Sequence, residues 1–209
     1  STPKPSSAAS DVYKRQTYGA ERRPVAQQLI DFDREWSTLM ARKPSEITDP
    51  TDLATYYLAT AEFPSGFMTQ YTSSMITGSD AHQSLAVGYP LGKRFKSAEV
   101  VRVGDGNAIH LGHHAKADGR WRVYAFAGRD AATLDAWAAA AAPVFERFTS
   151  ADADTDAVFD VKAIYQQPYE EIEVTSTPAL FQPKTGPLGL TDWEKVYAAG
   201  PSKLSLIHI

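Results

Sequence analysis

The sequence has no cysteine among its 209 residues. Disulfide bonds, thiolate catalysis and cysteine-ligated metal sites are therefore excluded. It also has no apolar run approaching the ~20 residues that a transmembrane helix needs. The first ten residues lack the apolar core of a secretory signal. Together these absences predict a cytoplasmic protein with no membrane partner.

An excess of basic residues is missing as well. The chain has 21 Lys and Arg against 25 Asp and Glu, which gives a formal net charge of −4. Nucleic-acid-binding domains usually present a basic face, so we expect no nucleic-acid partner. Hydrophobic residues make up 43% of the chain. That share is enough for a buried core in one ordinary domain or two small ones.

The common catalytic motifs are absent. Neither GxGxxG nor GxSxG occurs, and Gly104–Asn107 reads as a tight turn and not as a phosphate loop. Ser73 and Ser74 therefore lack the context of a nucleophile. The carboxylates at Glu170, Glu171 and Glu173 are expected to face solvent. We predict no catalytic residue, and the cofactor-binding residues remain unknown at this point.

One histidine cluster, HLGHH, contains His110, His113 and His114. On a helix these three side chains would share one face, but Gly112 weakens a regular helix there. A zinc site would need a further ligand such as Asp118. We favour a structural role near a turn and predict no metal site. A histidine-based metal enzyme is kept as a minor alternative.

The N-terminal half is expected to be helical. Residues 1–16 and 201–209 are interpreted as disordered or extraneous termini. Residues 17–42 predict a long amphipathic helix, with apolar residues three or four apart that should be buried against another element. A second helix is expected at 51–61, capped by Thr48 or Asp49. Residues 67–76 are expected to be irregular or a short helix, and 78–90 a loop.

The C-terminal half predicts a strand–helix–strand unit. Strands are expected at 98–103, 121–127 and 158–166, with a poorly defined segment between the first two. A helix is expected at 131–148, capped by Asp130. Further on, we expect a short strand at 177–183, a turn at 184–189 and a closing helix at 191–199. Thr191 and Glu194 form a capping box for that last helix.

This order of elements suits an α/β sandwich of the thioredoxin-like class. Because the chain has no cysteine, such a domain would serve structure or assembly and could not exchange thiols.

Three stretches together resemble one family, the FAD-dependent aromatic hydroxylases of the phenol 2-monooxygenase and 3-hydroxybenzoate 4-monooxygenase type. They run over residues 18–36, 92–127 and 189–196. The matching positions are Tyr18, Glu21, Arg22, Pro24, Val25 and Ala26; then Gly92, Arg94, Phe95, His110, Leu111, Gly112, His113, Lys116, Ala117, Asp118, Gly119, Arg120 and Tyr124; then Gly189, Leu190, Asp192, Glu194, Lys195 and Val196.

The resemblance implies a C-terminal fragment. In that family the flavin motifs lie upstream, and the C-terminal domain is thioredoxin-like and takes part in dimer contacts. Residues 17–90 would be the helical end of the FAD and substrate domain, and 91–200 the thioredoxin-like domain. The parent would use FAD, NAD(P)H and O2 to hydroxylate a phenol or hydroxybenzoate. This portion would be inactive alone and would form a homodimer.

A second reading stays open at this stage. The chain could instead be a stand-alone assembly or binding module with a thioredoxin-like core that lacks redox activity. The exposed apolar side of helix 25–40 would then be an interface.

Overall fold

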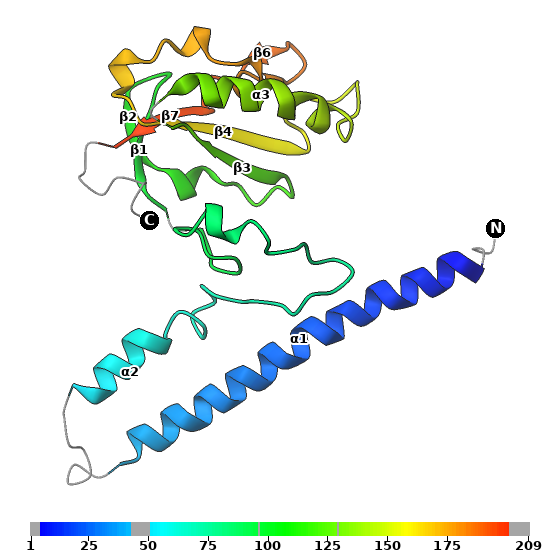
Figure 1. Ribbon diagram of the computed structural model, residues 1–209, viewed down its shortest axis with the longest axis vertical. Helices are drawn as coiled ribbons and strands as arrows, with labels where there is room; N and C mark the ends of the chain where they lie inside the picture. The colour runs from blue at the N-terminus through cyan, green and yellow to red at the C-terminus, as the bar shows by residue number, and fades with distance from the viewer. Residues whose placement is uncertain (1–4, 43–50, 96, 129, 201–209) are drawn as a thin grey trace. The chain divides into compact units, whose positions relative to one another are not determined.

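The computed structural model describes residues 5–42, 51–95, 97–128 and 130–200 (Figure 1). The chain divides into two units, Ser1–Phe95 and Lys96–Ile209, called unit 1 and unit 2 below. The capping residues expected at Thr48 and Asp49, and the C-terminal segment 201–209, lie outside the described residues.

Unit 2 is built on a five-stranded mixed sheet with the order β2-β1-β7-β4-β3. Strand β1 runs antiparallel to both of its neighbours, whereas β3, β4 and β7 are parallel to one another. The strands are β1 Glu99–Arg102, β2 Asn107–His110, β3 Trp121–Phe126, β4 Phe159–Tyr165 and β7 Val196–Ala199. The predicted strands at 98–103, 121–127 and 158–166 are thus confirmed.

Helix α3, Ala131–Glu146, connects β3 to β4 and covers one face of the sheet (Figure 1). Its predicted cap is confirmed, because the Asp130 side chain accepts a hydrogen bond from the Ala132 N–H at 3.0 Å. The helix continues through Pro143. Leu134 and Ala138 point into a core that also contains Val161, Ala163, Phe181 and Val196. This is the predicted thioredoxin-like α/β fold.

The closing helix predicted at 191–199 is wrong. Leu190–Thr191 forms β6, which pairs with β5, Lys184–Thr185, and Val196–Ala199 forms β7 at the centre of the main sheet. Val196, Tyr197 and Ala198 are each 0% exposed, so both faces of this strand are covered. Glu194 does not cap a helix and instead pairs with Arg102 at 2.9 Å.

The short strand predicted at 177–183 is also wrong. Ala179–Phe181 forms the 3-10 helix η6, which follows η4, Tyr169–Glu171, and η5, Val174–Ser176. The turn drives the ring of Phe181 into the core, where its exposure is 0%. The segment left undefined before residue 121 forms β2 and then η3, Leu111–His114.

The described part of unit 1 contains α1, Pro5–Met40, α2, Asp52–Thr60, and η2, Gln83–Leu85, with turns and irregular chain between α2 and η2. Both predicted helices are present, and α1 begins at Pro5, within the segment 1–16 interpreted as a disordered or extraneous terminus. Residues 67–76 are irregular apart from a bridge between Met68 and Lys93.

The apolar stripe of α1 is only partly covered. The ring of Trp36 stacks on Tyr56 with centroids 6.1 Å apart, and Tyr56 Oη donates to Glu35 at 2.9 Å. Leu29 and Met40, on the same stripe, are 48% and 58% exposed. The burial predicted for this stripe is therefore not achieved. Among the residues of unit 1 whose burial is described, none is buried.

Candidate functional site

A network of buried charges lies on the sheet face opposite α3. Side chains alternate along β4, so Val161 and Ala163 face α3 while Asp160 and Lys162 face the other way. Asp160 is 1% exposed and accepts hydrogen bonds from Lys162 and, at 2.7 Å, from Lys195 Nζ. Its register partner on β3, Arg122, places Nε 3.0 Å from Oδ2 without hydrogen-bond alignment.

A second carboxylate, Asp156, extends the network. It is 6% exposed and accepts from Lys195 Nζ at 2.9 Å and from Arg120 Nη1 at 2.6 Å. Arg120 Nε and Arg122 Nη2 in turn donate to Asp118 at 2.9 and 2.6 Å. Acidic and basic groups thus alternate from the turn before β3 to the residue before β7.

The local field sets the charge state of these groups. Burial alone would raise the pKa of Asp160, but the hydrogen bonds from Lys162 and Lys195 outweigh it and lower that pKa. Burial would lower the pKa of Lys195, yet Asp160 and Asp156 raise it. For Lys162 burial prevails, so its pKa is lowered despite Asp160. The network therefore links β3, β4 and the residue before β7 through shared ion pairs, and Asp160, which contacts Lys162, Lys195 and Arg122, lies at its centre.

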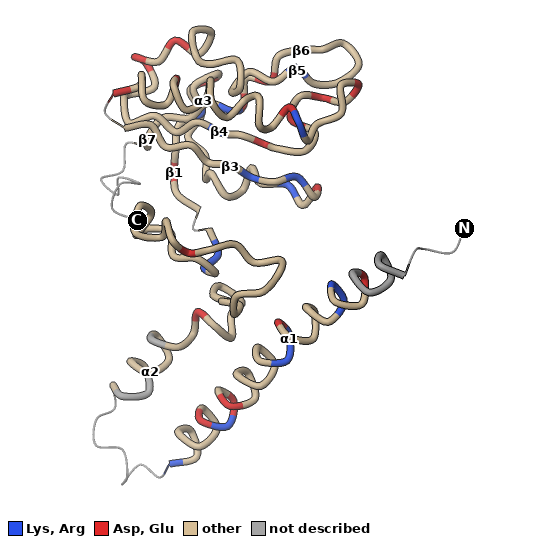
Figure 2. Tube along the Cα trace, turned by 45° about the vertical axis from the view of Figure 1, so that its right-hand side comes forward, with Lys and Arg blue, Asp and Glu red and all other residues tan. Residues whose placement is uncertain are grey.

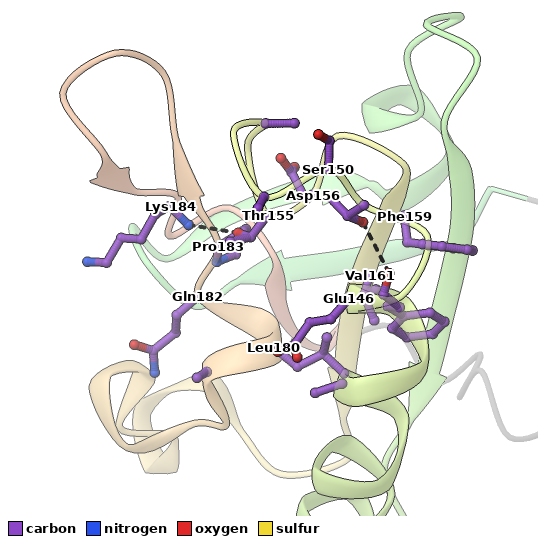
Figure 3. A pocket seen from close by; sticks show the side chains of 16 residues that line it. Glu146, Ser150, Thr155, Asp156, Phe159, Val161, Leu180, Gln182, Pro183 and Lys184 are labelled. Atoms are coloured by element: carbon purple, nitrogen blue, oxygen red, sulfur yellow. Dashed lines mark hydrogen bonds between the residues drawn. The ribbon is translucent and has the colours of Figure 1, made fainter.

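A cavity of about 590 Å³ opens on the α3 side of the same unit (Figure 3). It lies between the C-terminal end of α3, the loop 149–156, the start of β4 and the segment 179–184. Most of its wall is apolar. The apolar side chains that line it are Ala142, Phe145, Ala151, Ala153, Phe159, Val161, Ala179, Leu180 and Pro183.

The polar groups around this cavity are mostly engaged. The backbone N–H of Lys184 donates to Thr155 Oγ1 at 3.1 Å, whereas the Lys184 side chain points away from the other labelled residues (Figure 3). Gln182 Nε2 donates to Thr177 O at 2.6 Å. Asp156 reaches the cavity but its Oδ2 is held by Arg120 and Lys195. The cavity thus offers shape and apolar surface on the scale of small-ligand sites.

The three histidines of the HLGHH cluster do not share one face of a helix. His110 ends β2, while His113 and His114 lie in η3. The rings of His110 and His113 are 5.2 Å apart and tilted by 44°. Asp118, the further ligand considered, is instead occupied by Arg120 and Arg122. Within the ranges that the structure describes, no group of three potential ligands is placed to hold a metal ion.

The remaining sequence candidates are scattered. Ser74 lies in a turn where its backbone N–H donates to Thr77 Oγ1 at 2.6 Å. Glu170 and Glu171 are exposed in η4. Glu173 caps η5 by accepting from Thr175, and this hydrogen bond lowers the pKa of its carboxyl. None of these side chains lines the cavity.

Sequence reasoning missed the charged network. Its one visible signal is a pair of opposite charges two residues apart in the otherwise apolar run FDVKAIY. A single Lys or Asp in such a run indicates that one face of the strand is exposed to water. Two opposite charges on the same face of the strand are also compatible with a buried ion pair.

No helix in the described part of the chain combines the length and the apolar character needed to cross a bilayer.

Comparison with known proteins identifies the family. The family described as phenol hydroxylase, C-terminal dimerisation domain, matches residues 69–206. The 3-hydroxybenzoate 4-monooxygenase of Comamonas testosteroni is 44% identical over 195 residues, which cover 87% of this chain and 30% of that protein. The FAD-dependent monooxygenase terD of Aspergillus terreus is 28% identical over 197 residues, 87% of this chain and 32% of that protein.

A third relative covers a shorter stretch. The phenol 2-monooxygenase fsqG of Aspergillus fumigatus is 38% identical over 116 residues, 54% of this chain and 19% of that protein. The chain thus spans at most about a third of the length of these curated relatives. Two thirds of its own length, including the whole charged network and the cavity, lies within the family match. The chain therefore belongs to the family of phenol hydroxylase C-terminal dimerisation domains.

Proposed function

We propose that this chain is the C-terminal portion of an FAD-dependent monooxygenase that hydroxylates a phenol or hydroxybenzoate with NAD(P)H and O2. In this proposal the portion pairs subunits and has no activity alone. One observation carries it: the similarity to the 3-hydroxybenzoate 4-monooxygenase runs over 87% of the chain at 44% identity. The parent enzyme is assigned to the cytoplasm.

The exposed apolar side chains of unit 1 support this proposal. Leu58, Leu85 and Val87 are 77%, 84% and 76% exposed, and none of the described residues of the unit is buried. Exposed apolar surface on this scale marks a contact with another protein part. We assign residues 17–90 to the end of a flavin and substrate domain, whose remainder would cover these side chains.

We assign unit 2 to the pairing of subunits. It has its own core, so it folds without that remainder, and residues 91–200 are assigned to subunit pairing. FAD would supply hydride acceptance and oxygen activation in the parent. No residue of this chain is assigned to FAD binding or to catalysis.

The test compares the chain with its full-length gene product. Flavin absorbance, NADH and NADPH oxidation, and hydroxylation of phenol and 3-hydroxybenzoate are measured for both proteins. We expect bound flavin and substrate-dependent NAD(P)H oxidation only in the longer protein. Stoichiometric, tightly bound FAD in the chain alone would contradict the assignment, as would a full-length product without flavin.

A second candidate function is a stand-alone assembly module. The complete core of unit 2 favours it, since such a domain needs no other part to be stable. The genomic sequence separates the two proposals. An in-frame flavin domain upstream supports the monooxygenase, whereas a genuine start codon near Thr17 supports the module.

A further inference from the structure

The outer surface of α3 has almost no charge. Between Asp135 and Glu146 the helix reads AWAAAAAPVF, without a single charged side chain. Helices that face water normally carry charges on their outer side. Helix α1 illustrates this, with basic and acidic residues recurring along its length (Figure 2). The outer side of α3 is therefore suited to contact with protein and not with water.

Five exposed residues form one line along this surface, which we call the α3 seam: Thr133, Trp137, Ala140, Val144 and Phe148. They are spaced by four, three, four and four residues, close to the alternation that aligns side chains where two helices pack. Trp137, Val144 and Phe148 are 37%, 50% and 63% exposed. The buried side of the helix uses other residues, Leu134 and Ala138.

The large side chains of the seam are already held in place. The Trp137 ring stacks on Phe181, with centroids 6.5 Å apart and planes 13° apart. Phe145 meets the same ring edge-on at 6.5 Å. The Phe148 ring packs edge-on against Phe159 at 6.3 Å. Aromatic anchors fixed in this way lose little entropy when a partner binds.

We propose that a second copy of this chain docks on the α3 seam, with the two α3 helices antiparallel about a two-fold axis beside Ala140, between residues 140 and 141. This inference rests on the proposed function, in which the domain pairs subunits, and names the surface that does so. A two-fold contact must be self-complementary. With the axis beside the small Ala140, between residues 140 and 141, Trp137 of one copy meets Val144 of the other, and Thr133 meets Phe148.

Charge complementarity supports the same arrangement. The antiparallel packing brings Arg147, just after the end of α3, near Asp130 of the other copy at the start of its helix. Opposite charges thus meet at both ends of a seam whose centre is uncharged. The seam extends over about 22 Å at ~1.5 Å per residue, long enough for several turns of helix contact.

Disulfide cross-linking tests the position of the axis. Because the native chain has no cysteine, Ala140→Cys introduces a single thiol. A disulfide needs Cα atoms ~4.4–6.8 Å apart, a distance available only next to the axis. Under mild oxidation we expect Ala140→Cys to form a covalent dimer on a non-reducing gel. The matched control, Ala139→Cys on the neighbouring exposed position, should remain uncross-linked.

Sedimentation equilibrium tests the contribution of the seam. Ala140→Glu places two like charges face to face at the axis and should weaken dimerisation by a factor of about 10 or more. Ala139→Glu makes the same substitution off the seam and should leave the dimer unchanged. Circular dichroism establishes whether both variants are folded. If Ala140→Glu does not fold, the near-isosteric cysteine variants still test the seam.

The outcomes separate this inference from the proposed function. A native chain that dimerises, cross-links through residue 140 and is weakened by Ala140→Glu supports both. A native chain that dimerises but is indifferent to both changes at 140 overturns the seam and leaves subunit pairing intact. A native chain that stays monomeric at high concentration overturns the pairing role and the seam together.

Discussion

The two units of this chain differ most in what they bury. Every buried residue among those described lies after Phe95, and the core of unit 2 includes Ala163, Phe181 and Val196 at 0% exposure. Unit 1 has long helices but no buried residue in its described part. Secondary structure alone therefore does not make a domain here: unit 2 is stabilised by its own core, and unit 1 needs surface from elsewhere.

Their polar contacts differ in the same way. In unit 1, Arg34 and Asp31 lie 4.0 Å apart with side chains 75% and 49% exposed. In unit 2, Lys195 and Asp160 lie 2.7 Å apart with side chains 6% and 2% exposed. Exposed pairs contribute little to stability, whereas breaking a buried pair leaves a charge without water or partner. Three predictions test this contrast.

The largest effect is expected from removing the central carboxylate of the network. Asp160→Ala removes the carboxylate that neutralises the buried Lys162, and it leaves Lys195 and Arg122 with their outer partners alone. The change should lower the free energy of unfolding of unit 2 by about 3–5 kcal/mol. Urea unfolding followed by circular dichroism measures this loss. The control is Asp105→Ala, whose side chain is 38% exposed beside Arg102 and whose loss should cost under about 1 kcal/mol. Equal losses for the two variants would refute the contrast.

A smaller effect is expected from acid. The pKa of Asp160 is lower in the folded chain than the ~3.9 of an unfolded aspartate. As the pH falls below about 4, the unfolded chain therefore binds the proton first, and the stability of unit 2 declines toward the folded pKa. Unfolding in urea at about pH 7 and about pH 3 measures the decline. In Asp160→Asn the loss of stability between these two pH values should be smaller. An equally large loss in that variant would show that other groups cause the decline.

The smallest effect is expected in unit 1. Trp36 contacts Tyr56 and Tyr57 but remains partly exposed, so Trp36→Ala should change the stability of this chain by less than about 1 kcal/mol. In the full-length parent the same ring would be covered, and its loss should cost about 3–5 kcal/mol. Thermal unfolding of both proteins provides the comparison. A similar small change in the parent would show that the α1 stripe is solvent-exposed there too.

The parts of the fold that local patterns determine were predictable. The cap at Asp130, the apolar face of α3 and the β-branched runs of β3 and β4 are read from consecutive residues. The segment 191–199 was not, because its local signal, Thr191 followed by Glu194, favours a helix. Val196–Ala199 becomes a strand because β1 and β4, distant in sequence, offer it two edges.

The site was less predictable than the fold for the same reason. Asp160 and Lys162 stand in one short run, but Lys195 follows 35 residues after Asp160 and meets it only in the folded sheet. The cavity is lined from four separate segments, none of which carries a motif. By contrast, the resemblance of residues 92–127 to the hydroxylases needed no folding argument, and the family match confirms it.

The position of β7 has a consequence for how this protein is made. The strand that joins the β2–β1 ribbon to the β3–β4 pair comes after all the other strands in the described part of the chain. During synthesis the ribosome must therefore release nearly the whole domain before its two halves can be joined. Until then the inner edges of β1 and β4 are open to pairing with other chains. A nonsense codon or a protease cut just before Val196 would leave those edges open permanently, so we expect such products to aggregate instead of persisting as shortened, folded domains.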